Sequence, residues 1–282
     1  MHAFPIPVVA SVETRGPGSQ TEDESLQYMD MPRDMRTYRT PVLPEPEEIR
    51  DLRAARDILN NVLTGLTAVR PEQATAKVNL ARLDVANLAL IDQLLGEGEV
   101  SACIDSAGGS LRIQESVFAG VWRVRMFDLD GHCLTDDIEI GGLPASVTIA
   151  SRAGQPTPDA PPLAPGVINA PALLAEIDAH LRQATSHHII NLSLLPFSPE
   201  DALWLDQALG RGTVTLLSRG YGNCRITATG ISRVWWVQYF NSQDALILNT
   251  LEITDAPEVA RAASEDQADS GERLAEVLAW IG

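Results

Sequence analysis

Two stretches of the 282-residue chain decide its fold: LLGEGEVSACIDSAGGSLRIQESVFAGVWRVRMFD at 94–128 and ALGRGTVTLLSRGYGNCRITATGISRVWWVQYFN at 208–241. From residue 112 to residue 144 the chain aligns with a second copy of itself at a constant offset of 113, and nine of these 33 positions are identical. Ordinary residue usage would give about two identities by chance. The identical pairs are Arg112/Arg225, Ile113/Ile226, Val121/Val234, Trp122/Trp235, Val124/Val237, Phe127/Phe240, Glu139/Glu252, Ile140/Ile253 and Pro144/Pro257. The sequence therefore predicts a duplicated module of about 100 residues, the size of a small domain.

Composition sets the predicted boundaries around this duplication. Residues 151–166 hold five prolines and almost no large apolar side chain, which is typical of a stiff linker. Residues 1–46 hold seven prolines together with acidic patches and indicate an extended N-terminal arm. We therefore expect the first repeat at 47–150 and the second repeat at 167–282.

Each repeat shows the same order of predicted elements. An amphipathic helix, at 47–66 and at 171–183, precedes a short strand, a second helix and three further strands. In Val121–Phe127 apolar residues alternate with arginine, as in a strand with one wet face. The predicted class is α/β in the α+β sense: two tandem repeats, each α–β–α–β–β–β, with both helices on one face of a mixed sheet. Residues Glu272–Ile281 are expected to form a closing helix.

Several conspicuous residues in the repeats have an architectural interpretation. The glycines of Gly-Glu-Gly (96–98) and Gly-Arg-Gly (210–212) lead from a helix into a strand, whereas a phosphate-binding loop leads from a strand into a helix. They are expected to end helices. Trp122 and Trp235 are expected in the core, and the acidic pair Asp136-Asp137 on a solvated face.

Charge and targeting signals narrow the class of protein. The formal net charge of −17 argues against nucleic acid and anionic membranes as partners, because both need a basic surface. The N-terminal stretch lacks the basic and apolar regions of a secretory signal, and no apolar run is long enough to span a bilayer. Three scattered cysteines do not suggest a disulfide framework. We therefore expect a cytoplasmic protein.

Signatures of catalysis or metal binding are weak. None of the five histidines stands in HExxH or at zinc-finger spacing, and no GxSxG, SxxK or Cys–His signature is present. The sequence therefore indicates a non-catalytic protein with no cofactor and no metal. The alternative is an iron–sulfur or metal carrier that uses Cys103, Cys133 or Cys224 together with His132. A further alternative is an enzyme of unknown reaction, which would need a polar cleft with converging ionisable groups.

Signals for protein–protein interaction are stronger. The arm carries the run MDMPRDM, and methionine adapts to irregular apolar surfaces. Trp236 replaces the arginine of the first repeat on the expected wet face of its strand, which indicates an interface between repeats or with a partner. The predicted partner-binding residues are Met29, Met31, Pro32, Met35 and Trp236.

Longer motifs give the chain a family resemblance over nearly its full length. They are FPIPVV (4–9), GPGSQ (16–20), MPRDM (31–35), LLGEGEVS (94–101), RIQESVFAGVWRVR (112–125), INLSLLPFSPED (190–201), GYG (220–222), ATGISRVWWV (228–237) and EITDAP (252–257). With these motifs the chain resembles the HupH/HyaF/HoxQ family of [NiFe]-hydrogenase expression/formation proteins.

The resemblance implies a non-catalytic accessory protein, or chaperone, for the maturation of an uptake [NiFe] hydrogenase. It implies action on the iron–sulfur small subunit before export, in cluster assembly or in protection from oxygen. The implied partners are the hydrogenase small-subunit precursor and a thioredoxin-like hydrogenase accessory protein. These expectations agree with an acidic chain that shows no active-site signature.

Overall fold

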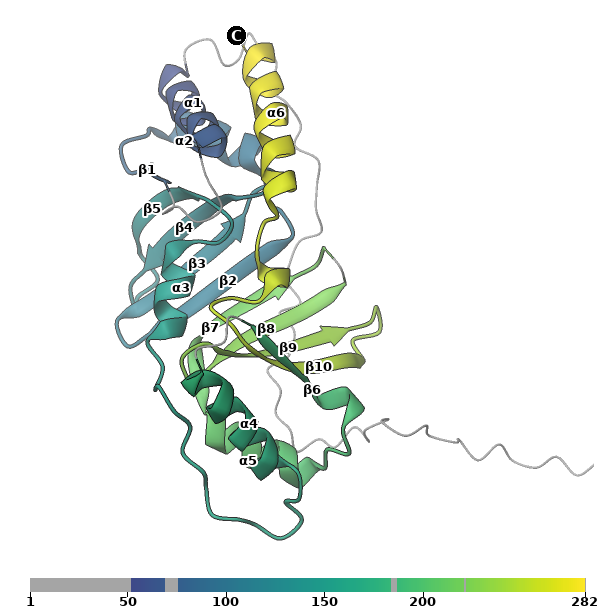
Figure 1. The fold of residues 1–282 in the computed structure, drawn as a ribbon. Helices are drawn as coiled ribbons and strands as arrows, with labels where there is room; N and C mark the ends of the chain where they lie inside the picture. The colour runs from purple at the N-terminus through teal and green to yellow at the C-terminus, as the bar shows by residue number, and fades with distance from the viewer. Residues whose placement is uncertain (1–51, 69–75, 184–186, 221, 282) are drawn as a thin grey trace, which may run out of the picture. The chain divides into compact units, whose positions relative to one another are not determined.

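A computed structural model describes residues 52–68, 76–183, 187–220 and 222–281, and all of them belong to one compact unit. Their architecture is α+β, with six α-helices and a ten-stranded sheet (Figure 1). The predicted arm at 1–46 lies outside the described residues. No helix in the described part of the chain has the length and apolar character needed to cross a membrane.

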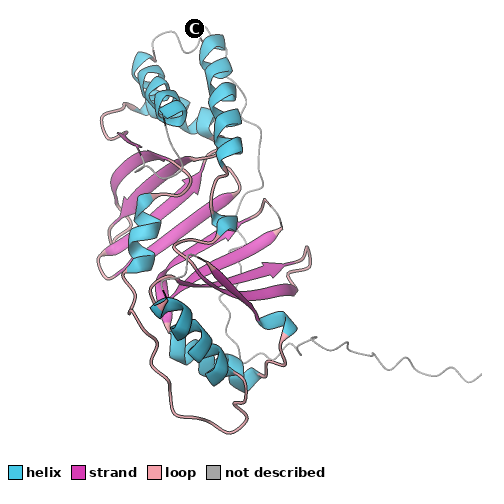
Figure 2. Ribbon diagram, viewed as in Figure 1, coloured by secondary structure: helices cyan, strands magenta, loops and turns pink. Residues whose placement is uncertain are grey.

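The two repeats share one order of main elements, a helix, a strand, a second helix and four strands, and Figure 2 shows the helices and strands in separate colours. The first consists of α1 (Arg53–Ala68), β1 (Ala76–Asn79), α2 (Val85–Leu95), β2 (Val100–Ser106), β3 (Gly109–Glu115), β4 (Val121–Phe127), β5 (Cys133–Ile140) and α3 (Ala145–Arg152). The second consists of α4 (Ala170–Arg182), β6 (His188–Asn191), the short 3-10 helix η1 (Leu192–Leu194), α5 (Pro199–Leu209), β7 (Arg211–Ser218), β8 (Asn223–Thr229), β9 (Val234–Phe240), β10 (Leu246–Ile253), the 3-10 helix η2 (Glu258–Ala260) and α6 (Ser264–Trp280).

The predicted order of elements lacks one strand in each repeat. Four strands follow the second helix of each repeat, and the last of the four in the first repeat, β5, contains the acidic pair Asp136-Asp137. The prediction that this pair is solvated is wrong, because Asp137 is only 2% exposed. Its carboxylate accepts a hydrogen bond of 2.6 Å from the Asn79 side chain and lies 3.0 Å from the Lys77 ammonium group. Burying this charge depends on those two partners on β1.

The strands form one continuous sheet in the order β1-β5-β4-β3-β2-β7-β8-β9-β10-β6. The prediction of a mixed sheet is wrong, since all pairings between these strands are antiparallel. Helix α2 connects β1 to β2, but three strands separate these two in the sheet, so the crossover creates no parallel pair. The repeats meet where β2 pairs with β7.

The pairing register repeats at the offset found in the sequence. Val121 faces Ile140 in the first repeat, and Val234 faces Ile253 in the second. The four-residue edge strands match as well: Ala76 faces Ile140, and His188 faces Ile253. The duplication therefore includes the backbone pairing as well as the sequence.

Three buried clusters hold helices on both faces of the sheet. Helices α1, α2 and α6 cover the β4–β5 end of one face, and α4 with α5 covers the β9–β10 end of the same face. The opposite face of the central strands packs against α3 and η2 through a cluster that includes Trp122 and Trp235. The expectation of helices on one face is correct for the first two helices of each repeat and wrong for α3. Both tryptophans are fully buried, as predicted.

Two segments, α6 and the end of α3, contact the repeat to which they do not belong. Leu274, Leu278 and Ile281, near the end of the second repeat, pack into the cluster of α1 and α2 in the first. This confirms the predicted closing helix, and Figure 1 shows α6 beside α1. In the other direction, Arg152 at the end of α3 forms an ion pair of 3.0 Å with Asp255 of the second repeat.

The glycine pairs have the structural role predicted for them. Gly96 and Gly210 end α2 and α5 with positive φ angles of 53° and 61°, a backbone conformation that favours glycine. A Cβ atom on Gly98 or Gly212 would collide with the backbone of the neighbouring strand. These glycines therefore let the chain turn from helix to strand at close quarters, and they do not form a phosphate-binding loop.

Candidate functional site

The central strands present a polar surface on the face that carries α1, α2, α4 and α5. Side chains alternate along a strand, so residues next to the buried cluster of the opposite face point to this surface. Its distinctive residues are arginine and phenylalanine. We call this surface the arginine face, and it consists of Arg112, Arg125, Phe127, Arg225 and Phe240.

Two arginines of this face lie directly opposite each other. Arg112 on β3 pairs with Arg125 on β4, and both side chains are exposed. Like charges at directly opposed positions destabilise a sheet. Neither arginine forms an ion pair with another described residue. The pair therefore places two cationic, multidentate donors side by side on a chain whose net charge is −17.

Aromatic rings hold two of the arginines in matching positions. The guanidinium carbon of Arg112 lies 4.9 Å from the centroid of the Phe127 ring, and that of Arg225 lies 5.8 Å from the centroid of the Phe240 ring. Both distances are within the range of a cation–π interaction. The two repeats thus conserve both members of the pair. They differ in exposure, because Arg225 is buried.

Trp236 is the predicted partner-binding residue that the structure describes. Its side chain is partly buried against the cluster of α4 and α5, and its indole N–H donates a hydrogen bond of 2.5 Å to Asn249 Oδ1. The expected wet face at this point of β9 is therefore covered by helices. Met29, Met31, Pro32 and Met35 lie outside the described residues.

The cysteines are not brought together. Cys103 lies on the arginine-face side of β2, and Cys224 lies in the core on the opposite side of the sheet. Burial raises the pKa of the Cys103 thiol to about 11 and that of the Cys224 thiol to about 12, so both stay protonated near neutral pH. Cys133 is exposed at the start of β5. Within the described residues, no group of three converging ligand side chains includes a cysteine.

One cluster of possible metal ligands was not predicted from the sequence. Glu176 and His180 on α4 converge with His188 on β6. The spacing of Glu176 and His180, four residues apart on a predicted helix, was a visible signal. The contribution of His188 depends on where the edge strand lies and could not be read from spacing alone.

Comparisons with known proteins place this architecture in a class of accessory proteins. The family model described as "HupH hydrogenase expression protein, C-terminal conserved region" matches residues 52–153 and 167–281. The chain is 50% identical to the hydrogenase expression/formation protein HoxQ of Cupriavidus necator, across 100% of this chain and 99% of that protein. It is 47% identical to HupH of Rhodobacter capsulatus, covering 94% and 95% of the two chains. It is 34% identical to the hydrogenase-1 operon protein HyaF of Escherichia coli, again covering 94% and 95%.

These matches extend over both repeats, and the family model divides at the segment between them. The chain belongs to the HupH/HoxQ/HyaF family of hydrogenase expression/formation proteins. Its role is therefore that of an accessory protein in hydrogenase maturation.

Proposed function

We propose that the protein binds the iron–sulfur small-subunit precursor of an uptake [NiFe] hydrogenase before export, and that the arginine face contacts this partner. In this role it assists assembly of the clusters or shields them from oxygen. Membership of the family supports a role in hydrogenase maturation. The choice of the small subunit, and of a thioredoxin-like accessory protein as a second partner, follows from the resemblance of the sequence motifs to those of the family.

The observation that carries the proposed contact is the opposed pair Arg112 and Arg125. Holding two exposed cations opposite each other works against folding, and a partner carboxylate between them would offset the repulsion. A guanidinium group binds a carboxylate through two parallel hydrogen bonds, which favours arginine over lysine at such a contact. We therefore propose that the partner presents an acidic segment to this face.

The test is a binding measurement between the purified full-length chain and the purified small-subunit precursor. Replacing both arginines by glutamate, in Arg112→Glu/Arg125→Glu, should weaken binding by a factor of ten or more, on the basis of about 1.5–3 kcal/mol for each hydrogen bond to a charged group. Arg82→Glu is the matched control. Arg82 is exposed in the turn after β1, away from the central strands, and its reversal should leave the dissociation constant unchanged.

Thermal unfolding of each variant shows whether a loss of binding reflects a loss of fold. A folded double variant that binds as tightly as the unmodified chain would rule out the arginine face as the contact. A chain that lacks residues 1–46 separately tests the arm and its methionines. Equal binding by that shortened chain would remove the arm from the proposed interface, while leaving the prediction for the arginine face intact.

A further inference from the structure

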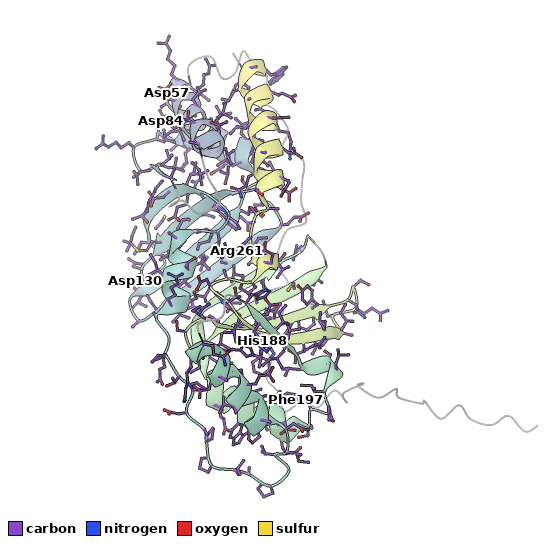
Figure 3. The ribbon with its side chains drawn as sticks, viewed as in Figure 1. Asp57, Asp84, Asp130, His188, Phe197 and Arg261 are labelled. Atoms are coloured by element: carbon purple, nitrogen blue, oxygen red, sulfur yellow. The ribbon has the colours of Figure 1, made fainter. Side chains whose placement is uncertain are left out.

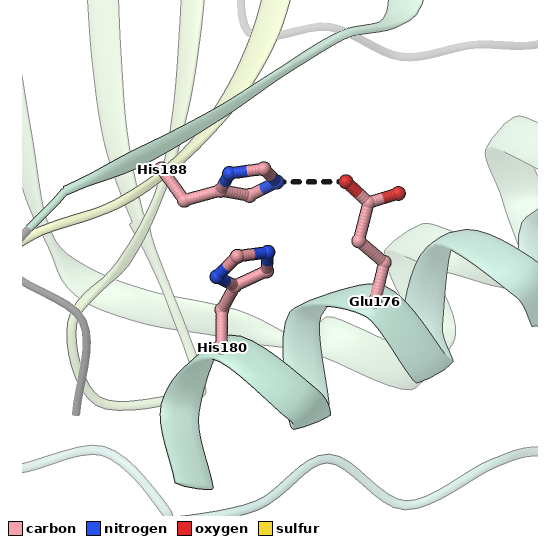
Figure 4. Close-up of side chains that lie close together, drawn as sticks. All are labelled: Glu176, His180 and His188. Carbon is pink, nitrogen blue, oxygen red and sulfur yellow. Dashed lines mark hydrogen bonds and ion pairs between the residues drawn. The ribbon is translucent and has the colours of Figure 1, made fainter. Parts of the chain in front are cut away.

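Two imidazoles and one carboxylate meet where the first helix of the second repeat passes its edge strand. Glu176 and His180 are four residues apart on α4 and so lie on the same side of the helix. His188 is the first residue of β6, and it points to the same side of the strand as the buried Ile190, toward α4. Figure 4 shows the three side chains directed toward one another.

The distances are close to those of a ligand set. His188 Nε2 lies 2.7 Å from Glu176 Oε1, and the rings of His180 and His188 stack with centroids 3.6 Å apart and planes inclined by 13°. One ligand atom from each residue lies within 4.8 Å of the other two. Bonds of about 2.0–2.1 Å in a tetrahedral zinc site place ligand atoms about 3.3 Å apart. Binding thus requires the separation of any two ligand atoms to change by no more than about 1.5 Å.

The side chains have room for that movement. The Glu176 side chain is 43% exposed and the His188 side chain 26% exposed, so the cluster opens to solvent on one side. The stacked rings must splay to direct a nitrogen lone pair at a shared ion. Three protein ligands would leave a fourth position for water or for a group from a partner.

The first repeat shows that the fold does not need this cluster. Ala76 occupies the position of His188: Ala76 faces Ile140 on β5, as His188 faces Ile253 on β10. An edge strand of the same length pairs in the same register without the imidazole. The edge strand therefore pairs with its neighbour without a histidine in the first repeat, where an alanine methyl group takes that position. The histidine is a feature of the second repeat alone.

A second group of possible ligands, Asp128, Asp130 and His132, does not support the same inference. It lies in the turn between β4 and β5, well apart from His188 (Figure 3). The Asp128 carboxylate already accepts hydrogen bonds from the backbone N–H groups of Asp130 and His132, and these bonds lower the pKa of Asp128. The hydrogen bonds of a tight turn account for that arrangement.

We infer that Glu176, His180 and His188 form a binding site for a divalent first-row transition metal. Two imidazole nitrogens and one carboxylate oxygen suit ions of intermediate softness such as Zn²⁺, Ni²⁺ or Co²⁺, and they suit Ca²⁺ and Mg²⁺ poorly, because those ions prefer oxygen ligands throughout. The site is independent of the arginine face and of the small-subunit partner. It also differs from the expectation, drawn from the sequence, that the protein holds no metal.

The test is a titration with Zn²⁺, measured by isothermal calorimetry, of the full-length chain after removal of any tag and treatment with a chelator. We expect one ion per chain and a weaker affinity at lower pH, because protons compete with the metal for the imidazole nitrogens. His180→Ala and His188→Ala should each lower the affinity about 100-fold or more, since each removes a ligand, and loss of a residue that only orients a ligand already costs about 10–100-fold. Co²⁺ provides a spectroscopic test: ligand-field bands in the visible should appear with the unmodified chain and disappear with His188→Ala.

His187→Ala is the matched control. His187 is the neighbour of His188 in sequence, but its ring faces Glu252 on the other side of the sheet, with Nε2 3.9 Å from that carboxylate. The His187→Ala variant should bind Zn²⁺ as tightly as the unmodified chain does. Glu176→Gln, which keeps the size of the side chain, replaces either histidine variant that fails to fold.

Two outcomes would overturn the inference. One is a chain that shows neither stoichiometric Zn²⁺ binding nor Co²⁺ bands at neutral pH, in which case the cluster is a hydrogen-bonded imidazole stack only. The other is an equal loss of affinity in His187→Ala and His188→Ala, which would place the metal elsewhere.

Discussion

The two repeats share their backbone register but stabilise the same point of the sheet by different chemistry. In the first, Arg123 on β4 forms ion pairs with Asp136 on β5 and with Asp92 on α2, where its Nη1 lies 2.7 Å from Asp92 Oδ1. In the second, the positions of Arg123 and Asp136 are taken by Trp236 and Asn249, joined by the hydrogen bond from the indole to the amide. An ion pair at these two positions of the first repeat thus corresponds to a hydrogen bond between an indole and an amide in the second.

This difference shows which parts of the module are fixed and which are free to change. The central tryptophans, the glycines that end helices and the strand register occur in both copies. On the helix-bearing face the Arg–Phe pairs are shared, but Arg123 and Arg125 are replaced by Trp236 and Gln238. The edge strands also differ, since His188 occupies the position that corresponds to Ala76. Function is expected where the copies differ, because the duplicated backbone already accounts for what they share.

The largest expected effect tests whether the two halves are equivalent in the core. Trp122 and Trp235 are fully buried, and their indole N–H groups donate to the carbonyl oxygens of Gly141 and Thr254. Replacing either by alanine should lower the free energy of unfolding by about 3–5 kcal/mol, because it leaves a cavity and an unpaired carbonyl group. Urea unfolding followed by circular dichroism measures both changes. A cost below about 1 kcal/mol for one of them would show that the halves are not packed alike.

The next effect concerns the exchanged pair. Arg123→Met should lower the free energy of unfolding by about 2–4 kcal/mol, because it leaves the partly buried Asp136 carboxylate without its cation. Adding Asp136→Asn should recover most of that loss by removing the charge. The reciprocal cycle in the second repeat starts from Asn249→Asp and should be rescued by Trp236→Arg. Additive costs in both double-mutant cycles, measured by urea unfolding, would contradict the view that each pair acts as a unit.

Much of this scaffold could be predicted from the sequence because it is encoded locally. The alternation in Val121–Phe127 predicts a strand with one polar face. At the start of α5, Ser198 and Asp201 form a capping box, which depends only on residues three apart in the sequence. The joining of the repeats through β2 and β7 could not be predicted, since strand patterns do not specify which edges pair. The apolar stripe of α6 predicts burial of that helix but does not reveal that it packs on the other repeat.

The candidate sites were predictable to a smaller extent, because they combine residues from elements that are not neighbours in the sequence. The sequence places Arg125 on a wet face, but only the pairing of β3 with β4 brings Arg112 opposite to it. The sequence shows His180 and His188 eight residues apart, yet their stacking requires the chain to turn from α4 into an edge strand at the far end of the sheet. Sites assembled across elements depend on topology, which short motifs do not carry.

A smaller effect concerns the dependence of stability on pH. Glu115 on β3 is 7% exposed, and burial raises its pKa from the ordinary 4.5 to about 7. The matching position of the second repeat is Ala228. Between about pH 4.5 and 7 the folded chain keeps a proton that the unfolded chain has lost, so stability should fall as pH rises through this window.

Glu115→Gln should reduce that fall and stabilise the chain at pH 8 by about 1–3 kcal/mol, since one pKa unit corresponds to about 1.4 kcal/mol. The part that remains is expected from Glu252, whose pKa burial also raises. The amide oxygen can still accept the hydrogen bond that Gly120 N–H donates to Glu115. Urea unfolding at pH 5 and pH 8 measures the change. The same dependence on pH in Glu115→Gln as in the unmodified chain would assign the effect to another group.

The smallest effect on stability is expected at the arginine face, where the loss of binding should be largest. Arg112→Glu places a carboxylate directly opposite Arg125, and replacing a like-charged pair with an opposite one should stabilise the sheet by about 0.2–1 kcal/mol. The matching change in the second repeat, Arg225→Glu, should destabilise the chain, because Arg225 is buried and faces the uncharged Gln238. Thermal unfolding of both variants measures the role of each arginine in the fold, and the affinity for the small-subunit precursor measures its role in binding. A variant Arg112→Glu that unfolds more easily than the unmodified chain would show that the opposed arginines serve the fold. One that unfolds later and binds more weakly would show that the first repeat tolerates their repulsion for the sake of a partner.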